Sequence, residues 1–314
     1  MSETLQSRTG PALALQLALF NILTRPLARL PLGWGLTLGA AGGRLAYHLL
    51  ARRRRIALAN LELARETGFL PPDFQVRAAA RAVFANHGRG AWELLRAYHR
   101  GLAPFRADCR VAEGGEHLVQ ALGECRHSGR GLMILTGHLG NWEIMCHFIA
   151  EFFGFRLNLV GRQTGRPFTD ALTRRLRTMN GNRFLAKDGS ARDMLAVLRS
   201  GGVLGTLIDQ ATLTSAPKAA ALVPFMGREA TFNLGPLRLA RRAGAAIILV
   251  LCRREGRTHF AHFHPPLPPA PDRPEEEDNL AKAGQINAWL GEFIQRHPDQ
   301  WLWGHRRWKT RPGG

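Results

Sequence analysis

From Gly131 onward, short apolar runs alternate with longer segments whose apolar residues recur at helical spacing. Short apolar runs bounded by turn residues are typical of buried strands, and the longer segments are typical of helices. Such alternation predicts an α/β protein with a central mixed, mostly parallel sheet flanked by helices. We expect strands near 132–136, 156–160, 203–208, 246–251 and 258–264, and helices near 142–153, 168–179, 190–199, 234–242 and 280–296.

The beginning of the chain is unusually apolar. Pro11–Leu23 is too short to span a bilayer alone, and Leu30–Leu50 is longer but interrupted by an arginine. The basic cluster Arg52–Arg55 that follows suits anionic lipid headgroups. We therefore expect residues 1–55 to form one or two helices that anchor in the membrane or lie on it, followed by one α/β domain over residues 56–314. A buried pair of soluble helices is the alternative.

Glycines recur every fourth residue in the second apolar stretch, at Gly35, Gly39 and Gly43. A helix with small residues at this spacing can bring its backbone close to a neighbouring helix. Two further helices are expected at 57–66 and 74–100, where Ala, Leu, Arg and Glu dominate.

The charge balance predicts an anionic partner. Lys and Arg number 43 against 24 Asp and Glu, which gives a formal net charge of +19. Nucleic acid, anionic lipid and an acidic carrier protein would all be attracted. The arginines are dispersed and no groove-entering helix or stacking platform is recognisable, so we expect no nucleic acid as partner.

Neither the cysteines nor the histidines predict a metal site. The four cysteines show no C-x-x-C spacing, so we expect reduced thiols and a cytoplasmic location; they are Cys109, Cys125, Cys146 and Cys252. On a strand, His262 and His264 would share one face and His259 would lie on the other, so we expect a solvated edge there.

Polar and charged residues follow each expected strand. Ligands of open α/β sheets bind beyond the carboxyl ends of the strands, so these residues would meet at one crevice. The segments are Thr136–Glu143, Gly161–Gln163, Asp209–Gln210 and Arg253–Arg254. For Arg162 a phosphate contact is the favoured role. For Asp209 the more ordinary role is to cap a helix or to pair with an arginine.

His138 and Glu143 form the candidate acid/base pair. On one continuous helix their side chains would point about 140° apart around the axis, too far to cooperate. Gly137 and Gly140 can bend the chain after the strand, and Asn141 can cap the next helix. Glu143 could then accept a hydrogen bond from one imidazole nitrogen, while the other removes a proton from a hydroxyl of the acceptor substrate.

The stretch His138–Glu143 resembles the H-x4-D/E motif of the lysophospholipid acyltransferase superfamily, in the form found in the lipid A biosynthesis (late) acyltransferases. The resemblance covers the chain from about Leu45 to Pro312. It continues in order through Gly161–Arg162, Asp209–Gln210, Pro224–Gly227, Ala230–Thr231, Leu239–Arg242 and Trp301–Lys309. Such an ordered series is far more specific than any single motif.

The resemblance implies a glycerol-phosphate-acyltransferase-like fold and a defined reaction. A fatty acyl group would pass from acyl carrier protein to a hydroxyl of a lipid A precursor, an anionic glycolipid, at the cytoplasmic face of the cell inner membrane. His138 would be the general base and Glu143 its partner, with no metal and no dissociable cofactor. The expected substrate-binding residues are Asn141, Arg162, Asp209 and Gln210.

Several alternatives stay open. The wording HLGNWE is shared with glycolipid acyltransferases outside lipid A synthesis, so another membrane glycolipid or a lysophospholipid is the rival acceptor. Coenzyme A is the rival donor, because it presents the same pantetheine thioester. A basic nucleic-acid-binding module and a hydrolase are the rivals from other classes. The sequence contains neither G-x-S-x-G nor H-E-x-x-H, which disfavours a hydrolase.

Overall fold

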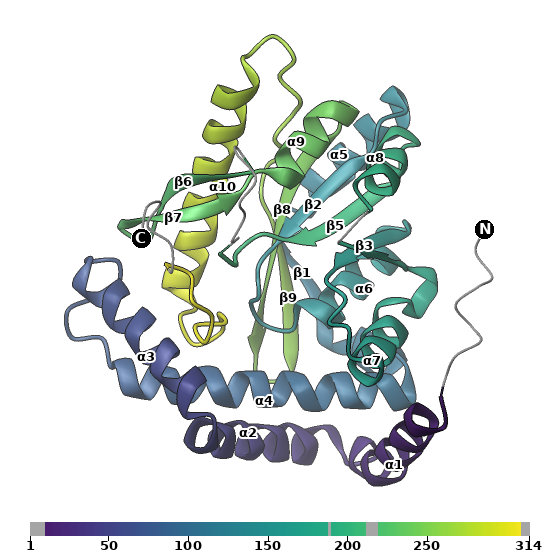
Figure 1. Ribbon diagram of the computed structural model, residues 1–314, viewed down its shortest axis with the longest axis vertical. Helices are drawn as coiled ribbons and strands as arrows, with labels where there is room; N and C mark the ends of the chain where they lie inside the picture. The colour runs from purple at the N-terminus through teal and green to yellow at the C-terminus, as the bar shows by residue number, and fades with distance from the viewer. Residues whose placement is uncertain (1–9, 188–189, 212–218, 309–314) are drawn as a thin grey trace.

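A seven-stranded sheet with the order β1-β9-β8-β2-β5-β3-β4 forms the centre of the computed structural model, which describes residues 10–187, 190–211 and 219–308. Figure 1 shows the sheet with helices on both faces. Its strands are β1 (Cys109–Glu113), β2 (Leu132–Thr136), β3 (Leu157–Gly161), β4 (Arg183–Ala186), β5 (Val203–Leu207), β8 (Ala246–Glu255) and β9 (Thr258–Phe263).

The sheet is mixed and mostly parallel, as the sequence predicts. All neighbouring strands run parallel except β8 and β9, which form an antiparallel pair. A separate antiparallel hairpin consists of β6 (Ala220–Phe225) and β7 (Arg228–Asn233). Met226 and Gly227 make its two-residue turn, both with positive φ (53° and 74°), as a tight hairpin requires.

The helices that follow the strands cover the two faces. They are α5 (Gly115–Ser128), α6 (Trp142–Phe152), α7 (Pro167–Arg177), α8 (Ala191–Arg199), α9 (Gly235–Ala243) and α10 (Glu275–Arg296). Two short 3₁₀ segments are η1 (Ala103–Asp108) and η2 (Met179–Gly181).

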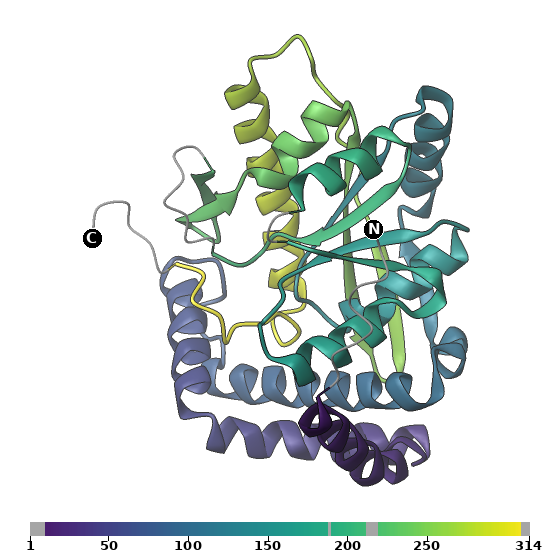
Figure 2. The same ribbon diagram turned by 45° about the vertical axis from the view of Figure 1, so that its right-hand side comes forward.

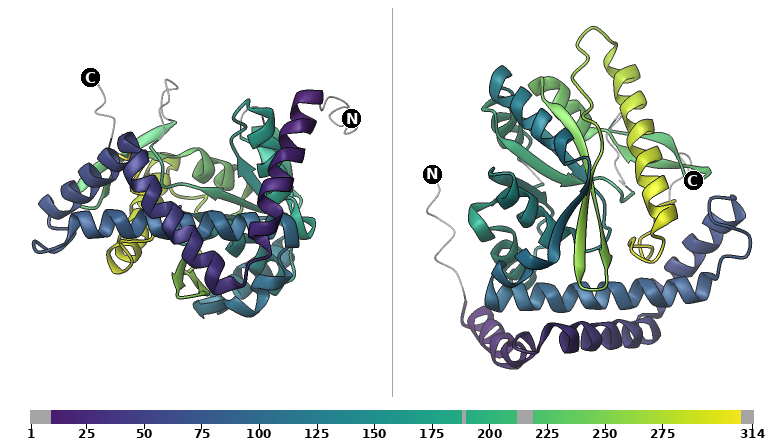
Figure 3. Two further views of the ribbon diagram at one scale, coloured as in Figure 1. Left: turned by 90° about the horizontal axis from the view of Figure 1, so that it is seen from below. Right: turned by 180° about the vertical axis from the view of Figure 1, so that it is seen from behind.

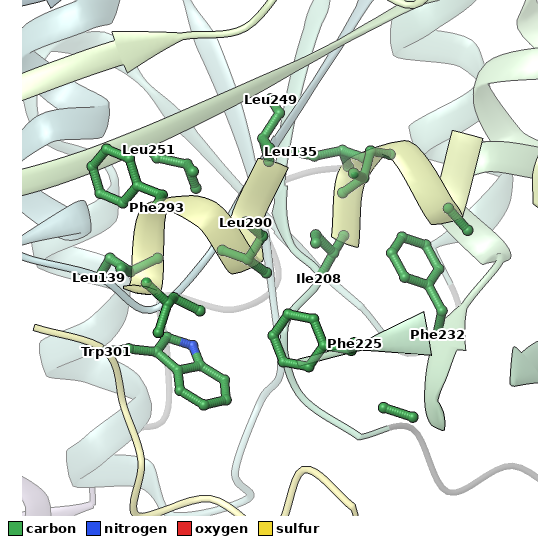
Figure 4. Packing of buried hydrophobic residues seen from close by; sticks show 14 of the residues in the cluster. Leu135, Leu139, Ile208, Phe225, Phe232, Leu249, Leu251, Leu290, Phe293 and Trp301 are labelled. Atoms are coloured by element: carbon green, nitrogen blue, oxygen red, sulfur yellow. The ribbon is translucent and has the colours of Figure 1, made fainter. Parts of the chain in front are cut away.

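Alternate residues of the central strands point into two separate cores. On β2, Met133 and Leu135 pack with α8, α9 and α10, whereas Leu132 and Ile134 pack with α5 and α6. This alternation follows from the two-residue period of a strand. Figure 4 shows the first core, in which Leu290 and Phe293 of α10 meet the strand residues.

Four helices precede the sheet: α1 (Pro11–Ala28), α2 (Leu32–Leu49), α3 (Ala51–Glu66) and α4 (Val76–Arg100). Figure 3 shows α2 lying alongside the long helix α4. The expected boundary between residues 55 and 56 stays a prediction, and α3 runs continuously across it.

Glycines bring α2 and α4 together. A methyl group on Gly39 would lie 2.7 Å from the carbonyl oxygen of Gly88, and one on Gly43 would lie 2.1 Å from that of Phe84. Neither position can hold a larger residue without separating the helices. The predicted close approach of a helix at these glycines is therefore confirmed, and α4 is the partner.

The outer faces of α1 and α2 expose large apolar side chains. Ile22 and Leu23 on α1 are 69% and 70% exposed, and Trp34 and Leu49 on α2 are 75% and 70% exposed. Among the described residues, α1 is the helix long and apolar enough to cross a membrane, with a mean hydropathy of 1.2 over its 18 residues. These helices therefore present an apolar surface that the rest of the described chain does not cover.

Candidate functional site

The pairing of β2 with β5 creates the site. The two strands run parallel with Thr136 opposite Leu207, and the amide of Ile208 continues the ladder by donating to the carbonyl of Thr136 at 3.0 Å. The residues that follow the two strands therefore become neighbours. These residues are His138 and Asp209, which lie far apart in the sequence.

His138 and Asp209 are joined by two hydrogen bonds. The imidazole Nδ1 lies 2.7 Å from Oδ1 of Asp209, and the backbone N–H of His138 donates to Oδ2 at 2.8 Å. The indole of Trp301 donates to the same Oδ2 at 2.7 Å. Burial raises the pKa of Asp209, but the charge of His138 and these hydrogen bonds outweigh it and lower the pKa to about 2. Asp209 is therefore a buried, ionised carboxylate.

This contact decides which imidazole nitrogen is free to act as a base. A carboxylate can only accept hydrogen bonds, so Nδ1 of the neutral ring carries the proton and Nε2 carries the lone pair. The side-chain amide of Gln210 contacts Nε2 at 3.2 Å. The ring of Trp142 packs edge-on against the imidazole, with centroids 4.8 Å apart. The ring is therefore fixed with Nε2 toward Gln210.

Gln210 also lines a large groove, which connects the site with the helices that precede the sheet. The groove has a volume of about 1180 Å³ and is mostly apolar. Helices α1, α2, α4 and α7 form its walls together with the segment 302–305. Phe20, Leu38 and Trp92 are among the lining residues. The groove is therefore lined both by the helices that expose apolar side chains and by Gln210, whose amide contacts His138 Nε2.

Glu143 does not contact the imidazole, contrary to the geometry expected from the sequence. It lies in the first turn of α6, as predicted, but its carboxylate accepts two hydrogen bonds from Nε and one from Nη2 of Arg177, at 2.5–3.2 Å. Burial lowers the pKa of Arg177, and the hydrogen bond and charge of Glu143 raise it above its usual value. The pair borders a small apolar cavity of about 40 Å³ between α6 and the sheet.

Asn141 is the predicted N-cap of α6. Its side-chain oxygen accepts from the amide of Ile144 at 3.3 Å, and its Nδ2 donates to Glu93 of α4 at 2.7 Å. Both ends of this buried amide thus contact protein groups. Asn141 fixes the turn that carries His138 to α4.

Glu93 is the centre of a buried polar cluster beneath that turn. It is 1% exposed and contacts both Arg254 and His259. Burial raises the pKa of Glu93, but hydrogen bonds from Arg254 and His259 outweigh it and lower the pKa to about 2. The cluster therefore holds α4, β8, β9 and the turn together with an ionised carboxylate.

Two expectations about the neighbouring strands are wrong. β8 extends to Glu255, paired with β9, so Arg254 lies within the strand and is buried against Glu93 instead of following the strand end. The three histidines of β9 and its end do not form a solvated edge, because His259 is fully buried and His262 is 8% exposed. Within the described ranges, no cluster of residues suitable for a metal is found.

Arg162 follows β3 as predicted, and its side chain is exposed. Arg162 does not line the groove. Among the described residues, the arginine in the lining is Arg53. Lys187 donates its backbone N–H to the carbonyl of Gly161 at 2.8 Å, which places two basic residues together at the carboxyl ends of β3 and β4. Arg162 thus lies on the same edge of the sheet as His138, outside the groove.

The sequence did not indicate that Arg177 and Glu93 contact residues of the motif, or that Trp301 has a separate role. Arg177 ends a helix with several basic residues, which looks like an ordinary solvated helix end. Glu93 lies within an amphipathic helix far from the motif in sequence. Trp301 lies in the stretch Trp301–Lys309 that carries part of the resemblance, and the structure buries it at 1% exposure.

Comparison with known proteins places these residues in a family context. Residues 6–310 match the family model described as bacterial lipid A biosynthesis acyltransferase. The chain is 27% identical over 285 residues to the lipid A biosynthesis lauroyltransferase of Escherichia coli K12, covering 88% of this chain and 86% of that protein. It is also 27% identical over 287 residues to the palmitoleoyltransferase of the same organism, and to the lipid A biosynthesis acyltransferase of Shigella flexneri. In each case 88% of this chain and 85% of the relative are covered.

Proposed function

The chain belongs to the bacterial lipid A biosynthesis acyltransferase family, and on that premise we propose that it transfers a fatty acyl group from acyl carrier protein to a hydroxyl of a lipid A precursor, with His138 as general base. The observation that carries this proposal is the fixed imidazole. Its Nδ1 is held by the ionised Asp209, and its Nε2 meets Gln210 at the groove.

The chemistry follows from this arrangement. The acceptor hydroxyl takes the place of the Gln210 amide beside Nε2 and gives its proton to the ring as its oxygen attacks the thioester carbonyl carbon. Asp209 stabilises the imidazolium that forms. When the tetrahedral intermediate collapses, the carbon–sulfur bond breaks, and the thiolate takes the proton from the imidazolium. The products are an ester and a free thiol.

Acyl chains suit the groove. Its apolar walls can cover hydrocarbon, and its outer part is built from the same helices that expose apolar side chains. We propose that α1 and α2 contact the cytoplasmic face of the inner membrane, so that the chains of the acceptor enter the groove from the bilayer. The arginines 52–55 that follow α2 would then meet anionic headgroups.

An acidic carrier protein suits the basic surface beside the site. Exposed basic residues follow the carboxyl ends of β3 and β4, at Arg162, Arg166, Lys187 and Arg192. Parallel strands place Arg162 and Lys187 on the edge of the sheet that also carries His138. We propose that this surface receives the donor and that Arg162 contacts phosphate.

Glu143 has a different role in this proposal. It holds Arg177 in place beside the small apolar cavity between α6 and the sheet.

The test is acyl transfer by the purified protein in lipid vesicles. Wild-type protein, acyl carrier protein thioester and a lipid A precursor should yield a lipid whose mass has increased by one acyl chain. His138→Ala should form no such product while keeping its circular dichroism spectrum and melting temperature. Near-normal turnover by His138→Ala would reject the role of the base. Transfer to a lysophospholipid but not to the lipid A precursor would reject the acceptor.

A further inference from the structure

The segment after α10 returns to the turn that carries His138. Figure 2 shows this segment running between the sheet and helices α3 and α4. The amide of Leu302 donates to the carbonyl of His138 at 3.1 Å, and the amide of Gly140 donates to the carbonyl of Gln300 at 3.3 Å. The turn and the C-terminal segment are therefore paired like two short antiparallel strands.

Gln300 fixes the segment on its other side. Its side-chain oxygen accepts from the backbone N–H of Arg254 at 2.7 Å, and its amide donates to the carbonyl of Arg254 at 2.9 Å. Both groups belong to β8, so the segment is held to the sheet as well as to the turn. This leaves little freedom for the residue that follows.

That residue is Trp301, whose side chain connects the segment to Asp209. Its ring is 1% exposed and packs edge-on against Phe225 and Trp303, with centroid distances of 5.8 and 4.8 Å. Its Nε1 donates to Oδ2 of Asp209 at 2.7 Å. Because Oδ2 has two donors, Trp301 and the backbone of His138, the carboxylate cannot rotate without breaking both bonds. Oδ1 is thereby kept on Nδ1 of His138.

We propose that Trp301 is a positioning residue, which acts on His138 through Asp209. The inference rests on the proposed function, because it assigns Trp301 to the support of the same base. Without the indole N–H, Oδ2 keeps a single donor and the carboxylate can turn. The imidazole then spends less time with Nε2 toward the groove, and it loses part of the stabilisation of its charged form.

Trp303 provides a matched control. It lies on the same segment, is fully buried, and donates its Nε1 to the backbone carbonyl of Pro298 at 2.6 Å. Trp303→Phe and Trp301→Phe each remove one buried indole donor, and they differ in whether the acceptor belongs to the site. A general loss of packing should therefore appear in both variants.

The experiment measures two quantities in both variants: the steady-state constants with the thioester donor and lipid acceptor, and the NMR resonance of the His138 Nδ1 proton. A lost hydrogen bond to a charged group predicts that kcat of Trp301→Phe falls about tenfold or more with KM unchanged. The Nδ1 proton should move from the position it takes in the wild type. Trp303→Phe keeps an aromatic ring against Trp301 and should change both quantities much less.

The outcomes separate the inference from the proposed function. Equal changes in both variants, or an unmoved resonance with near-normal kcat in Trp301→Phe, would overturn the positioning role. If Trp301→Phe does not fold, benzothienylalanine at position 301 keeps the ring shape and replaces only the N–H by sulfur. The resonance reports a contact of the resting protein. It therefore decides the role of Trp301 even if His138→Ala turns out to be active and the proposed function fails.

Discussion

Asp209 holds His138 with both of its carboxylate oxygens, one on the ring at 2.7 Å and one on the backbone amide at 2.8 Å. The carboxylate thus sets both the tautomer of the imidazole and the position of the turn that carries it. Glu143, which the motif suggests for this task, is bound to Arg177 instead.

This relationship predicts different effects for two changes of a carboxylate to an amide. Asp209→Asn presents an N–H where Nδ1 needs an acceptor, so the ring takes the wrong tautomer. We expect kcat to fall about a thousandfold or more, by analogy with the triad carboxylate of serine proteases. Glu143→Gln should reduce kcat much less, because it weakens only the contact with Arg177. Steady-state kinetics of both variants is the measurement, and a larger loss in Glu143→Gln would contradict the assignment.

The lowered pKa of the buried Glu93 predicts that the stability of the folded protein decreases at acidic pH. Its pKa is lowered from 4.5 to about 2, so its ionised form stabilises the folded state above pH 4.5. That contribution should be lost as the pH falls from 4.5 to about 2. Glu93→Gln should be strongly destabilised at pH 7, by about 3–5 kcal/mol, because Arg254 loses its buried partner. Its stability should also depend less on pH across the acid range.

Denaturant unfolding at several pH values measures both effects. Glu113→Gln is a suitable control, because that carboxylate is 69% exposed in its contact with His262. A Glu93→Gln variant with wild-type stability at pH 7 would show that the cluster does not hold the turn and α4 together.

The exposed face of α1 predicts membrane binding that depends on apolar side chains. Ile22→Ser and Leu23→Ser, made together, remove two side chains that are about 70% exposed and make few contacts within the protein. We expect partition onto anionic vesicles to fall about tenfold or more, with an unchanged melting temperature. Val119→Ser on α5, where the side chain is 59% exposed, should leave partition unchanged. Equal flotation of all variants with vesicles would reject this face as the contact.

The basic surface from β3 to α8 predicts recognition of the protein part of the donor. Lys187→Glu with Arg192→Glu should lower kcat/KM for acyl carrier protein thioester about tenfold at low salt, and added salt should reduce the difference. The same variant should use a short pantetheine thioester as well as the wild type does. Arg126→Glu, at the end of α5 before β2, lies at the opposite edge of the sheet and should change neither rate. Equal losses with both donors would point to damage at the site.

The sequence predicted those parts of the fold where each strand is buried on both faces. The expected strand 132–136 coincides with β2, and 203–208 differs from β5 by one residue, because continuous apolar runs have few alternatives. β1 and β4 were missed because they are short edge strands whose residues are mostly exposed or half-buried. The helix expected at 280–296 begins earlier, at Glu275, because the negative charge of residues 275–278 favours the helix start.

The motif pointed to the correct turn but not to all of its contacts. The bend at Gly140, with φ of 54°, and the cap by Asn141 follow from local chemistry and were predictable. The partner of the imidazole was not, because spacing within one segment does not reveal which strand pairs with β2. Once β5 is known to be that strand, the residues after the two strands must meet, and Asp209 becomes the obvious neighbour. The roles assigned to the site residues stay predictions.

The pairing of the turn with Gln300 and Leu302 joins two segments that lie far apart in the sequence. Closing so long a loop costs conformational entropy, so these contacts depend on the fold of the sheet that lies between the two segments in the chain. If the segment detached, His138 would lose the strand-like neighbour on its turn and Asp209 would lose its indole donor at the same time. Local opening of residues 300–302 would therefore release the imidazole while the central sheet stays folded.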